Sequence, residues 1–305
     1  MDKIIVKNIS KSFGDTKALD NISLNVKEGE LFGMIGPDGA GKTTLIRILL
    51  TLLLADTGEA EVNGLDVIKD YKKIRSTVGY MPGRFSLYTD LTVEENMELF
   101  AKIFGTTIEE NYYLVKDIYS QIEPFKDRQA GKLSGGMKQK LALSCALIHK
   151  PDVLFLDEPT TGVDPVSRKE LWDMLKKLKK QGITIFVSTA YMDEAKMCDR
   201  VALINKGKLL SVDSIPEIIN RFDGILYAIE ADNNYHLIEE LKKFEYTDRV
   251  YPFGEVLHLI IKGNEDKTNE INHYLQSKGF DNFTIKKIKP DIEDCFINFM
   301  VQDEQ

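Results

Sequence analysis

The sequence predicts an α/β protein that carries a second, smaller α+β domain. From the start to about Ser211, apolar runs of strand length alternate with helical patterns, which is typical of an α/β domain. After residue 220 the pattern changes to shorter strands and helices. The length of 305 residues agrees with two domains at about 150 residues each. We therefore place the domains at residues 1–220 and 221–305.

The composition is that of a folded, water-soluble protein. Hydrophobic residues make up 43% and charged residues 29% of the chain. The net charge of −8 does not favour attraction to phosphate backbones, so we expect no nucleic-acid partner. The longest apolar run, residues 48–55, is far shorter than the roughly 20 residues that a membrane span needs. Three irregularly spaced cysteines and an opening without a signal-peptide pattern favour the cytosol.

A glycine-rich loop between a predicted strand and a predicted helix has the pattern of a phosphate-binding loop. Its glycines let the backbone curl so that amides point inward, where the helix N-terminus completes an anion site. Lys42 would neutralise the β- and γ-phosphates of ATP, and the hydroxyl of Thr43 would ligate Mg²⁺. The predicted nucleotide-binding residues of this loop are Gly36, Pro37, Asp38, Gly39, Ala40, Gly41, Lys42, Thr43 and Thr44.

Two carboxylates follow another apolar run, at residues 153–156. This run predicts a buried parallel strand, and ligands of open α/β sheets bind at the carboxyl ends of such strands. Asp157 would hold Mg²⁺ through water. Glu158 would polarise a water molecule for attack on the γ-phosphate, which makes it the predicted catalytic residue.

The segment LSGG at residues 133–136 precedes a predicted helix with basic residues and a glutamine. With these three motifs, the sequence resembles the ATP-binding cassette (ABC) family over roughly residues 3–220. The resemblance implies that Ser134, Gly135 and Gly136 contact the γ-phosphate of a nucleotide held by another cassette. It therefore implies a head-to-tail dimer that encloses two ATP molecules.

Other positions match the family in order. Phe13 corresponds to the aromatic residue that stacks on adenine, although a core residue is the alternative interpretation. Residues 91–96 resemble the start of the helical subdomain that docks on a membrane subunit, and we place that subdomain at about residues 84–150. Thr92 and Glu95 have the spacing of a capping box at its first helix.

Two side chains that the family uses in hydrolysis are missing. Gly83 occupies the position of a glutamine that touches Mg²⁺ and the attacking water, and Ala190 occupies that of a histidine at the γ-phosphate. Asp38 replaces the usual asparagine. Because one preorganised donor is worth about 10²- to 10³-fold in rate, we expect the chain's own site to bind Mg·ATP but to hydrolyse it slowly. The alternative is that this subfamily hydrolyses ATP with Glu158 alone.

The last 85 positions predict a ferredoxin-like βαββαβ module followed by a helix. We expect the strands at 226–231, 248–251, 256–262 and 283–287, and the helices at 235–244 and 265–277. A final helix after Pro290 has apolar residues along one face, with Asp291 as its N-cap. The module either has a purely structural role in a dimer interface or regulates the cassette, and the sequence favours neither of these two roles.

Together these patterns predict the ATP-binding subunit of a bacterial ABC transporter, an exporter whose permease is a separate polypeptide. Its segments around Asp38, Gly83 and Ala190 resemble the N-terminal cassette of tandem-cassette exporter ATPases. The expected partners are the permease, a second cassette in a homo- or heterodimer, ATP and Mg²⁺. We expect a peripheral location at the cytoplasmic face of the inner membrane. Two alternatives are a mainly non-hydrolytic regulatory or structural cassette and a soluble ABC ATPase that acts on ribosomes or DNA.

Overall fold

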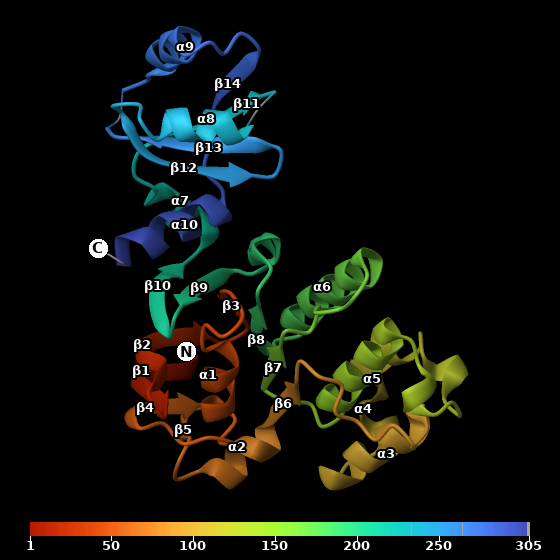
Figure 1. Cartoon of the computed structure of the whole chain (residues 1–305). Coiled ribbons are helices and arrows are strands. Elements are labelled where there is room, and N and C mark those ends of the chain that lie inside the picture. Colours follow the sequence, from red (N-terminus) through yellow and green to blue (C-terminus); the bar gives the residue numbers. More distant parts are fainter. Residues whose placement is uncertain (233, 264, 304–305) are drawn as a thin grey trace. The chain divides into compact units, whose positions relative to one another are not determined.

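The computed structural model describes residues 1–232, 234–263 and 265–303. The chain divides into two compact units (Figure 1). One unit comprises Met1–Ile215 and the chain from Phe299 onward, and the other comprises Pro216–Asn298. The sequence-based boundary lies slightly later, after residue 220. The first unit has the predicted α/β fold and the second the predicted α+β fold.

A six-stranded, mostly parallel sheet forms the centre of the first unit. Its strands lie in the order β10-β9-β3-β8-β7-β6, and only β10 pairs with its neighbour in the antiparallel direction. All residues of β3, β7 and β8 are buried, as expected for parallel strands covered on both faces. The strands are β3 (Leu31–Ile35), β6 (Val78–Met81), β7 (Val153–Asp157), β8 (Thr184–Thr189), β9 (Arg200–Asn205) and β10 (Lys208–Asp213).

Successive residues of these strands face two separate hydrophobic clusters. In β7, Leu154 and Leu156 pack into one cluster, whereas Val153 and Phe155 pack into the other. The second cluster also contains residues of α1 and of an antiparallel sheet in the order β2-β1-β4-β5. The bounds of these elements are β1 (Asp2–Phe13), β2 (Thr16–Lys27), α1 (Lys42–Leu49), β4 (Thr57–Val62), β5 (Leu65–Asp66) and α2 (Tyr71–Thr77).

The first cluster continues into a helical region on the other side of β6 (Figure 1). Thr92 and Glu95 form the expected capping box at the start of α3, and Thr107 and Glu110 form another at α4. Buried apolar residues of α3, α4 and α5 pack together, and α6 lies beside the central sheet. These helices are α3 (Val93–Ile103), α4 (Ile108–Tyr119), α5 (Gly135–Leu147) and α6 (Pro165–Lys180).

The second unit is a four-stranded antiparallel sheet with helices on both faces. The chain order is the predicted βαββαβ, and the strands lie in the order β12-β13-β11-β14. Tyr227 and Leu259 face α8 and α9, whereas the alternate residues Leu226 and Ile260 are buried on the opposite face. The elements are α7 (Ile215–Asn220), β11 (Ile225–Ala231), α8 (Asn234–Leu241), β12 (Thr247–Phe253), β13 (Val256–Ile261), α9 (Thr268–Ser277), β14 (Phe283–Ile288) and α10 (Ile292–Asp303).

The last helix, α10, packs on that opposite face of the sheet, and its Asp294 side chain is buried there. Asp294 of α10 accepts a hydrogen bond from the Tyr251 hydroxyl at 2.8 Å and lies 2.6 Å from Nδ1 of His258. Ile292 and Cys295 of the same helix are also buried. The expected apolar face of α10 is therefore buried, and a polar cluster fixes its position on the sheet.

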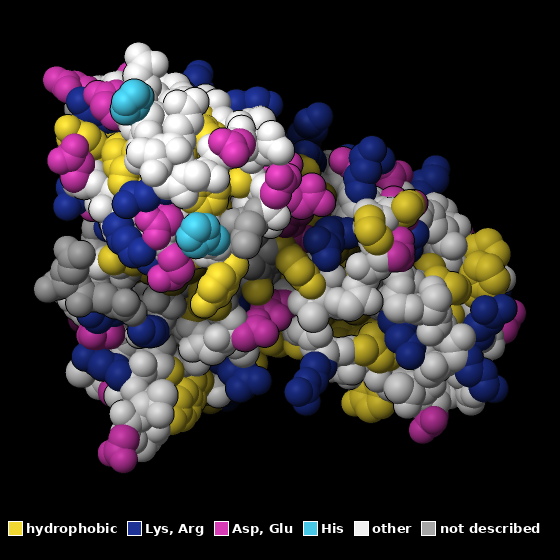
Figure 2. All heavy atoms as spheres, turned by 45° about the horizontal axis from the view of Figure 1, so that its top comes forward, with side chains coloured by type: hydrophobic (Ala, Val, Ile, Leu, Met, Phe, Trp, Pro, Cys, Tyr) yellow, Lys and Arg dark blue, Asp and Glu magenta, His cyan; other side chains and the backbone are white. Residues whose placement is uncertain are grey.

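Acidic and basic side chains alternate over the surface shown in Figure 2, without a large area of one sign. Within the part of the chain that the structure describes, no helix is both long enough and apolar enough to span a membrane.

Candidate nucleotide-binding site

The phosphate loop leaves β3 at Gly36 and enters α1 at Lys42, so a strand, a loop and a helix follow one another in the predicted order. A Cβ atom on Gly36 would lie 2.1 Å from the carbonyl oxygen of Ile204. Gly41 has a φ of 110°, and its Cβ would lie 2.4 Å from the carbonyl oxygen of Ala18. Both positions therefore require glycine, because the loop passes directly against neighbouring backbone.

The Lys42 side chain is buried inside this loop. Its Nζ donates to the carbonyl oxygens of Gly36 at 2.7 Å and Pro37 at 3.0 Å. It also lies 3.2 Å from a carboxylate oxygen of Glu158. The loop therefore fixes a positive charge beside the predicted catalytic carboxylate.

Thr43 and Asp157 converge beside the lysine. The Thr43 hydroxyl donates to Oδ1 of Asp157 at 3.0 Å, and Asp157 is buried at the carboxyl end of β7. A hydroxyl and one carboxylate are hard oxygen donors of the kind Mg²⁺ takes while it keeps several waters. Among the described residues there is no group of three or more His, Cys, Asp or Glu that could hold a metal. The donor set thus fits Mg²⁺ bound together with phosphates.

Glu158 adopts a left-handed backbone conformation, with a φ of 51°. Its amide donates both to the carbonyl oxygen of Ser188 at 3.0 Å and to the Ser188 hydroxyl at 3.1 Å. That hydroxyl donates in turn to Oδ1 of Asp157 at 2.7 Å. Ser188 is not among the residues predicted from the sequence. Its position at the end of an apolar strand was an available signal, because parallel strands end at the same edge of a sheet.

Five of the nine predicted loop residues and Glu158 line a small pocket of about 120 Å³, whereas Gly36, Pro37, Asp38 and Ala40 do not line it. The pocket also involves Ala18, which the sequence did not suggest. Phe13 does not line it: its side chain lies at the end of β1 and is 51% exposed. The lining residues are Ala18, Gly39, Gly41, Lys42, Thr43, Thr44 and Glu158.

The LSGG segment lies at the start of α5. The Ser134 hydroxyl caps this helix by accepting a hydrogen bond from the amide of Met137. A Cβ on Gly136 would lie 2.8 Å from the hydroxyl of Ser167, so a larger residue there would have to displace that hydroxyl. Gly135 lines a second pocket, of about 160 Å³, which Glu158 and the loop around Gly83 also border.

Gly83 and Ala190, the two positions where the sequence is expected to depart from the family pattern, have different surroundings. A Cβ on Gly83 would lie 2.9 Å from the carbonyl oxygen of Asp157, so the loop packs directly on the β7 backbone. One glutamine, Gln139, lines the second pocket, and its side-chain amide donates to the carbonyl oxygen of Pro159 at 2.5 Å.

Ala190 follows the end of β8 and is partly exposed. Beside it, the guanidinium of Arg168 stacks on the ring of Tyr191 at 4.1 Å. Arg168 also lies 3.6 Å from the buried carboxylate of Glu194, which accepts hydrogen bonds from Thr160 and Thr189. The neighbourhood of Ala190 is thus held together by an ionic network.

The strand β3, the glycine-rich loop and the helix α1, with a buried lysine and two carboxylates at the carboxyl end of β7 in the same sheet, define a P-loop nucleotide-binding domain. A family model described as "ABC transporter" matches residues 19–161. The chain is 32% identical over 303 residues to the Nod factor export ATP-binding protein I of Rhizobium sp. (strain N33), covering 97% of both chains. The chain therefore belongs to the family of ABC transporter ATP-binding proteins.

A second relative is longer. The chain is 38% identical over 306 residues to YbhF of Escherichia coli (strain K12), named a probable multidrug ABC transporter ATP-binding protein. This match covers 98% of the chain and 52% of YbhF, so the chain spans about half the length of that relative. A solved structure of the dimeric cassette MJ0796 bound to ADP and Pi matches with a TM-score of 0.63 and 28% identity, covering 69% of this chain and 98% of that one.

Proposed function

We propose that this chain is the ATP-binding subunit of an ABC exporter and that it couples ATP binding and hydrolysis to transport by a separate permease. The observation that carries the proposal is the convergence of Lys42, Thr43, Asp157 and Glu158 at one edge of the parallel sheet. Relatives named for multidrug transport and Nod factor export support an exporter. The subunit would lie at the cytoplasmic face of the bacterial inner membrane, attached through the permease.

Each converging residue has one part in this reaction. The loop amides and the Nζ of Lys42 bind and orient the phosphates, and Thr43 and Asp157 hold Mg²⁺. The ion, when bound, neutralises charge on the phosphates. Glu158 orients a water molecule toward the γ-phosphate, and its position 3.2 Å from Lys42 keeps the carboxylate close to the phosphate site.

A second cassette would complete the site. MJ0796, a similar cassette bound to ADP and Pi, is dimeric, and this supports a dimer of two cassettes. Ser134, Gly135 and Gly136 would then face the γ-phosphate of the partner's nucleotide. Because Gly83 and Ala190 lack the glutamine and histidine side chains, the chain's own site would turn over slowly, while its LSGG segment completes a faster site on a different cassette. A mainly non-hydrolytic cassette is the second candidate, and it rests on the same two positions.

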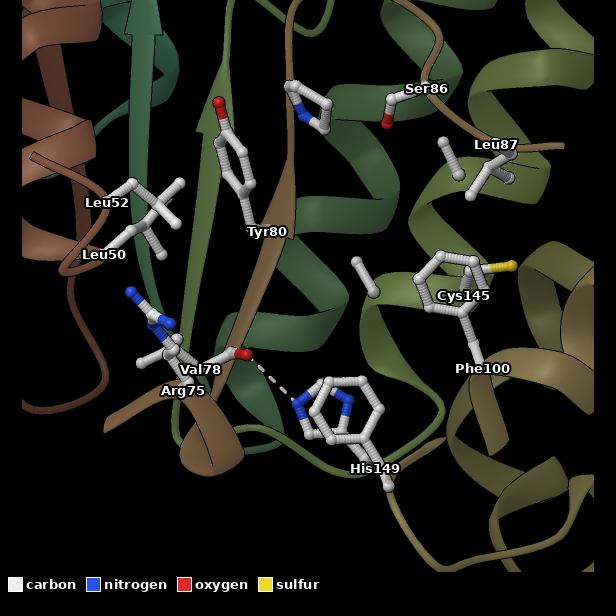
Figure 3. Close-up of a pocket in the computed structure, with 14 residues that line it drawn as sticks. Leu50, Leu52, Arg75, Val78, Tyr80, Ser86, Leu87, Phe100, Cys145 and His149 are labelled. Atoms are coloured by element: carbon white, nitrogen blue, oxygen red, sulfur yellow. Dashed lines mark hydrogen bonds between the residues drawn. The ribbon is translucent and has the colours of Figure 1, made fainter. Parts of the chain in front are cut away.

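The permease would dock in an apolar pocket of about 390 Å³ between the central sheet and the helical region. Figure 3 shows Leu50 and Leu52 on one wall and Phe100 and Cys145 on the opposite wall. Pro82 and Ser86 border both this pocket and the one beside Glu158. A permease helix seated here would therefore press on the loop that contains Gly83, next to the catalytic carboxylate.

The test measures ATP binding and ATP hydrolysis separately, for the chain alone and with the candidate partner cassette. We expect tight Mg·ATP binding and slow turnover by the chain alone. Glu158→Gln should keep binding and, in the presence of ATP, increase the dimer fraction seen by light scattering. Glu98→Gln, which changes a surface pair with Lys102, is the matched control and should behave as the wild type.

Two results would overturn parts of this proposal. Failure of the chain to bind Mg·ATP would exclude a nucleotide-driven function. Rapid hydrolysis by the purified homodimer that disappears in Glu158→Gln would exclude the slow site and favour a subfamily that works without the two missing side chains.

A further inference from the structure

We propose that Ser188 is a positioning residue for ATP hydrolysis and that its hydroxyl fixes the metal-binding carboxylate and the catalytic residue at once. This inference rests on the proposed function, because it takes Asp157 as the carboxylate that holds Mg²⁺ through water and Glu158 as the group that orients the attacking water. It concerns a side chain that neither the phosphate loop nor the LSGG segment contains.

The geometry places this hydroxyl between the two carboxylate residues. Ser188 is fully buried on β8, directly in register with Asp157 on β7. The amide of Glu158 can only donate, so at 3.1 Å the serine oxygen is the acceptor. The serine proton is then available for Oδ1 of Asp157 at 2.7 Å, and both bonds form at the same time.

One consequence concerns the orientation of the Asp157 carboxylate. Oδ1 accepts from Thr43 at 3.0 Å and from Ser188 at 2.7 Å. The Thr43 bond competes with the role of that hydroxyl as a metal ligand, whereas Ser188 is free of that conflict. Ser188 therefore holds the carboxylate while Thr43 binds metal. Loss of a hydrogen bond to a carboxylate that holds a metal typically lowers metal affinity or activity about 10- to 100-fold.

The other consequence concerns the Glu158 backbone. A φ of 51° is unfavourable for a residue with a side chain and persists only where neighbours hold it. The carbonyl oxygen and the hydroxyl of Ser188 both accept from the Glu158 amide, at 3.0 and 3.1 Å. The single residue Ser188 thus supplies both acceptors that hold this strained position beside the phosphate loop.

The test compares Ser188→Ala with Ser144→Ala. Ser144 is also fully buried, but its hydroxyl donates to the carbonyl oxygen of Lys140 within α5, at 2.8 Å. The readouts are the affinity for Mn²⁺ in the presence of ATP, by electron paramagnetic resonance, and kcat and KM for ATP. In Ser188→Ala we expect Mn²⁺ affinity and kcat to fall about 10-fold or more with KM for ATP nearly unchanged. Ser188→Thr, which keeps the hydroxyl, should recover most of the loss.

The Mn²⁺ measurement alone decides the proposal. An affinity in Ser188→Ala equal to that of the wild type and of Ser144→Ala would overturn it. If Ser188→Ala does not fold, Ser188→Cys takes its place, because a thiol is close to the hydroxyl in size but makes weaker hydrogen bonds. Its Mn²⁺ affinity is then compared with that of the wild type and of Ser144→Ala. Absence of ATP hydrolysis by the wild type, with or without a partner cassette, would instead contradict the proposed hydrolysis and leave the Mn²⁺ comparison valid.

Discussion

Gly83 and Ala190 differ in how easily their missing side chains can be restored. Ala190 already carries a Cβ and is partly exposed, so a histidine there needs no backbone movement. A Cβ on Gly83 would lie 2.9 Å from the carbonyl oxygen of Asp157, closer than side chains tolerate. We therefore expect a substitution at position 190 to change activity and a substitution at position 83 to lower stability.

We predict that Ala190→His raises the ATPase rate of the chain about 10-fold or more, because one preorganised donor is worth about 10²- to 10³-fold in rate. Steady-state ATPase assays measure this effect.

We predict that Gly83→Gln lowers the free energy of unfolding by about 1–3 kcal/mol through overpacking. Urea denaturation measures this effect. Gly83→Ala is the steric control and should be destabilised as well; a fully stable Gly83→Ala would contradict the packing argument.

His149 makes the junction between the central sheet and the helical region sensitive to acid. Its ring stacks on Phe104 at 3.7 Å. Its Nε2 lies 3.1 Å from the carbonyl oxygen of Val78, and Figure 3 shows this hydrogen bond as a dashed line. Because that carbonyl only accepts, Nε2 carries the proton, and the buried Nδ1 has no hydrogen-bond partner within the described chain. Burial lowers the pKa of His149 below its ordinary 6.5, although the bond to Val78 opposes this shift.

The direction of the pH dependence of stability follows from proton binding by the folded and unfolded chains. Below about pH 6.5 the unfolded chain takes up a proton at this histidine more readily than the folded chain does, so stability is lost as the pH falls and is fully present above pH 6.5. We predict that His149→Phe unfolds with less dependence on pH between 7.5 and 5.5 than the wild type does. His273→Phe, at an exposed position of α9, should keep the wild-type dependence. Equal pH dependence in all three proteins would refute the assignment.

Residue types at the site could be predicted because they form contiguous motifs. Lys42, Thr43, Asp157 and Glu158 each stand in a local pattern with a chemical meaning, and the structure places them together. The contacts of Ser188 with Asp157 and Glu158 and the packing of Gly83 were not predictable in this way, although the place of Ser188 at a strand end assigns it to this edge of the sheet. Both depend on which strands are neighbours, and a single strand does not reveal its neighbour.

At the scale of elements, α10 shows what periodicity can and cannot predict. Its apolar face was visible in the sequence, but not the buried polar cluster beneath it. Asp294 is 1% exposed and accepts from the Tyr251 hydroxyl and from the Asp291 amide, both at 2.8 Å. Burial, followed by the charge of Asp294, raises the pKa of Tyr251. The tyrosine therefore stays protonated and remains a donor.

We predict that Asp294→Ala destabilises the second unit by about 1.5–3 kcal/mol, the range for hydrogen bonds to a charged group. Hydrogen exchange of the β12 and β13 amides should accelerate accordingly. The fluorescence of Trp172, the single tryptophan, reports on the first unit and should show an unchanged transition. Asp281→Ala, at an exposed position before β14, is the control. Exchange rates equal to those of the control would show that the cluster does not hold α10.

The topology of the elements was only partly predictable. The order βαββαβ followed from alternating short patterns, and buried apolar runs predicted the parallel strands. The separate sheet β2-β1-β4-β5 was not anticipated, because half-buried antiparallel strands carry a weaker signal than fully buried ones. Strand order in either unit requires long-range pairing, which local patterns do not contain.

At the scale of the whole molecule, the apolar pocket between the two hydrophobic clusters of the first unit is where we expect force to be exchanged with the permease. Leu52 lines this pocket and is 56% exposed, whereas Leu54, two positions later, is 64% exposed and does not line it. Comparing variants at Leu52 and Leu54 therefore distinguishes the loss of a docking contact from the loss of an exposed leucine elsewhere on the surface.

We predict that Leu52→Asp weakens co-purification with the permease at least about 10-fold, because a charge would be buried without a partner. Leu54→Asp should bind as the wild type does. Detergent-solubilised complexes captured on the permease provide the measurement, and basal ATPase activity checks that both variants are folded. Equal retention of both variants would place the docking surface elsewhere.

The contact between Gly83 and the Asp157 carbonyl also bears on how this cassette can evolve. Before position 83 could accept a glutamine, the loop would have to move away from the β7 backbone. No such barrier protects Ala190. We therefore expect descendants of this chain to acquire a histidine at position 190 before a glutamine at position 83, because only the second substitution has to wait for a change in the backbone.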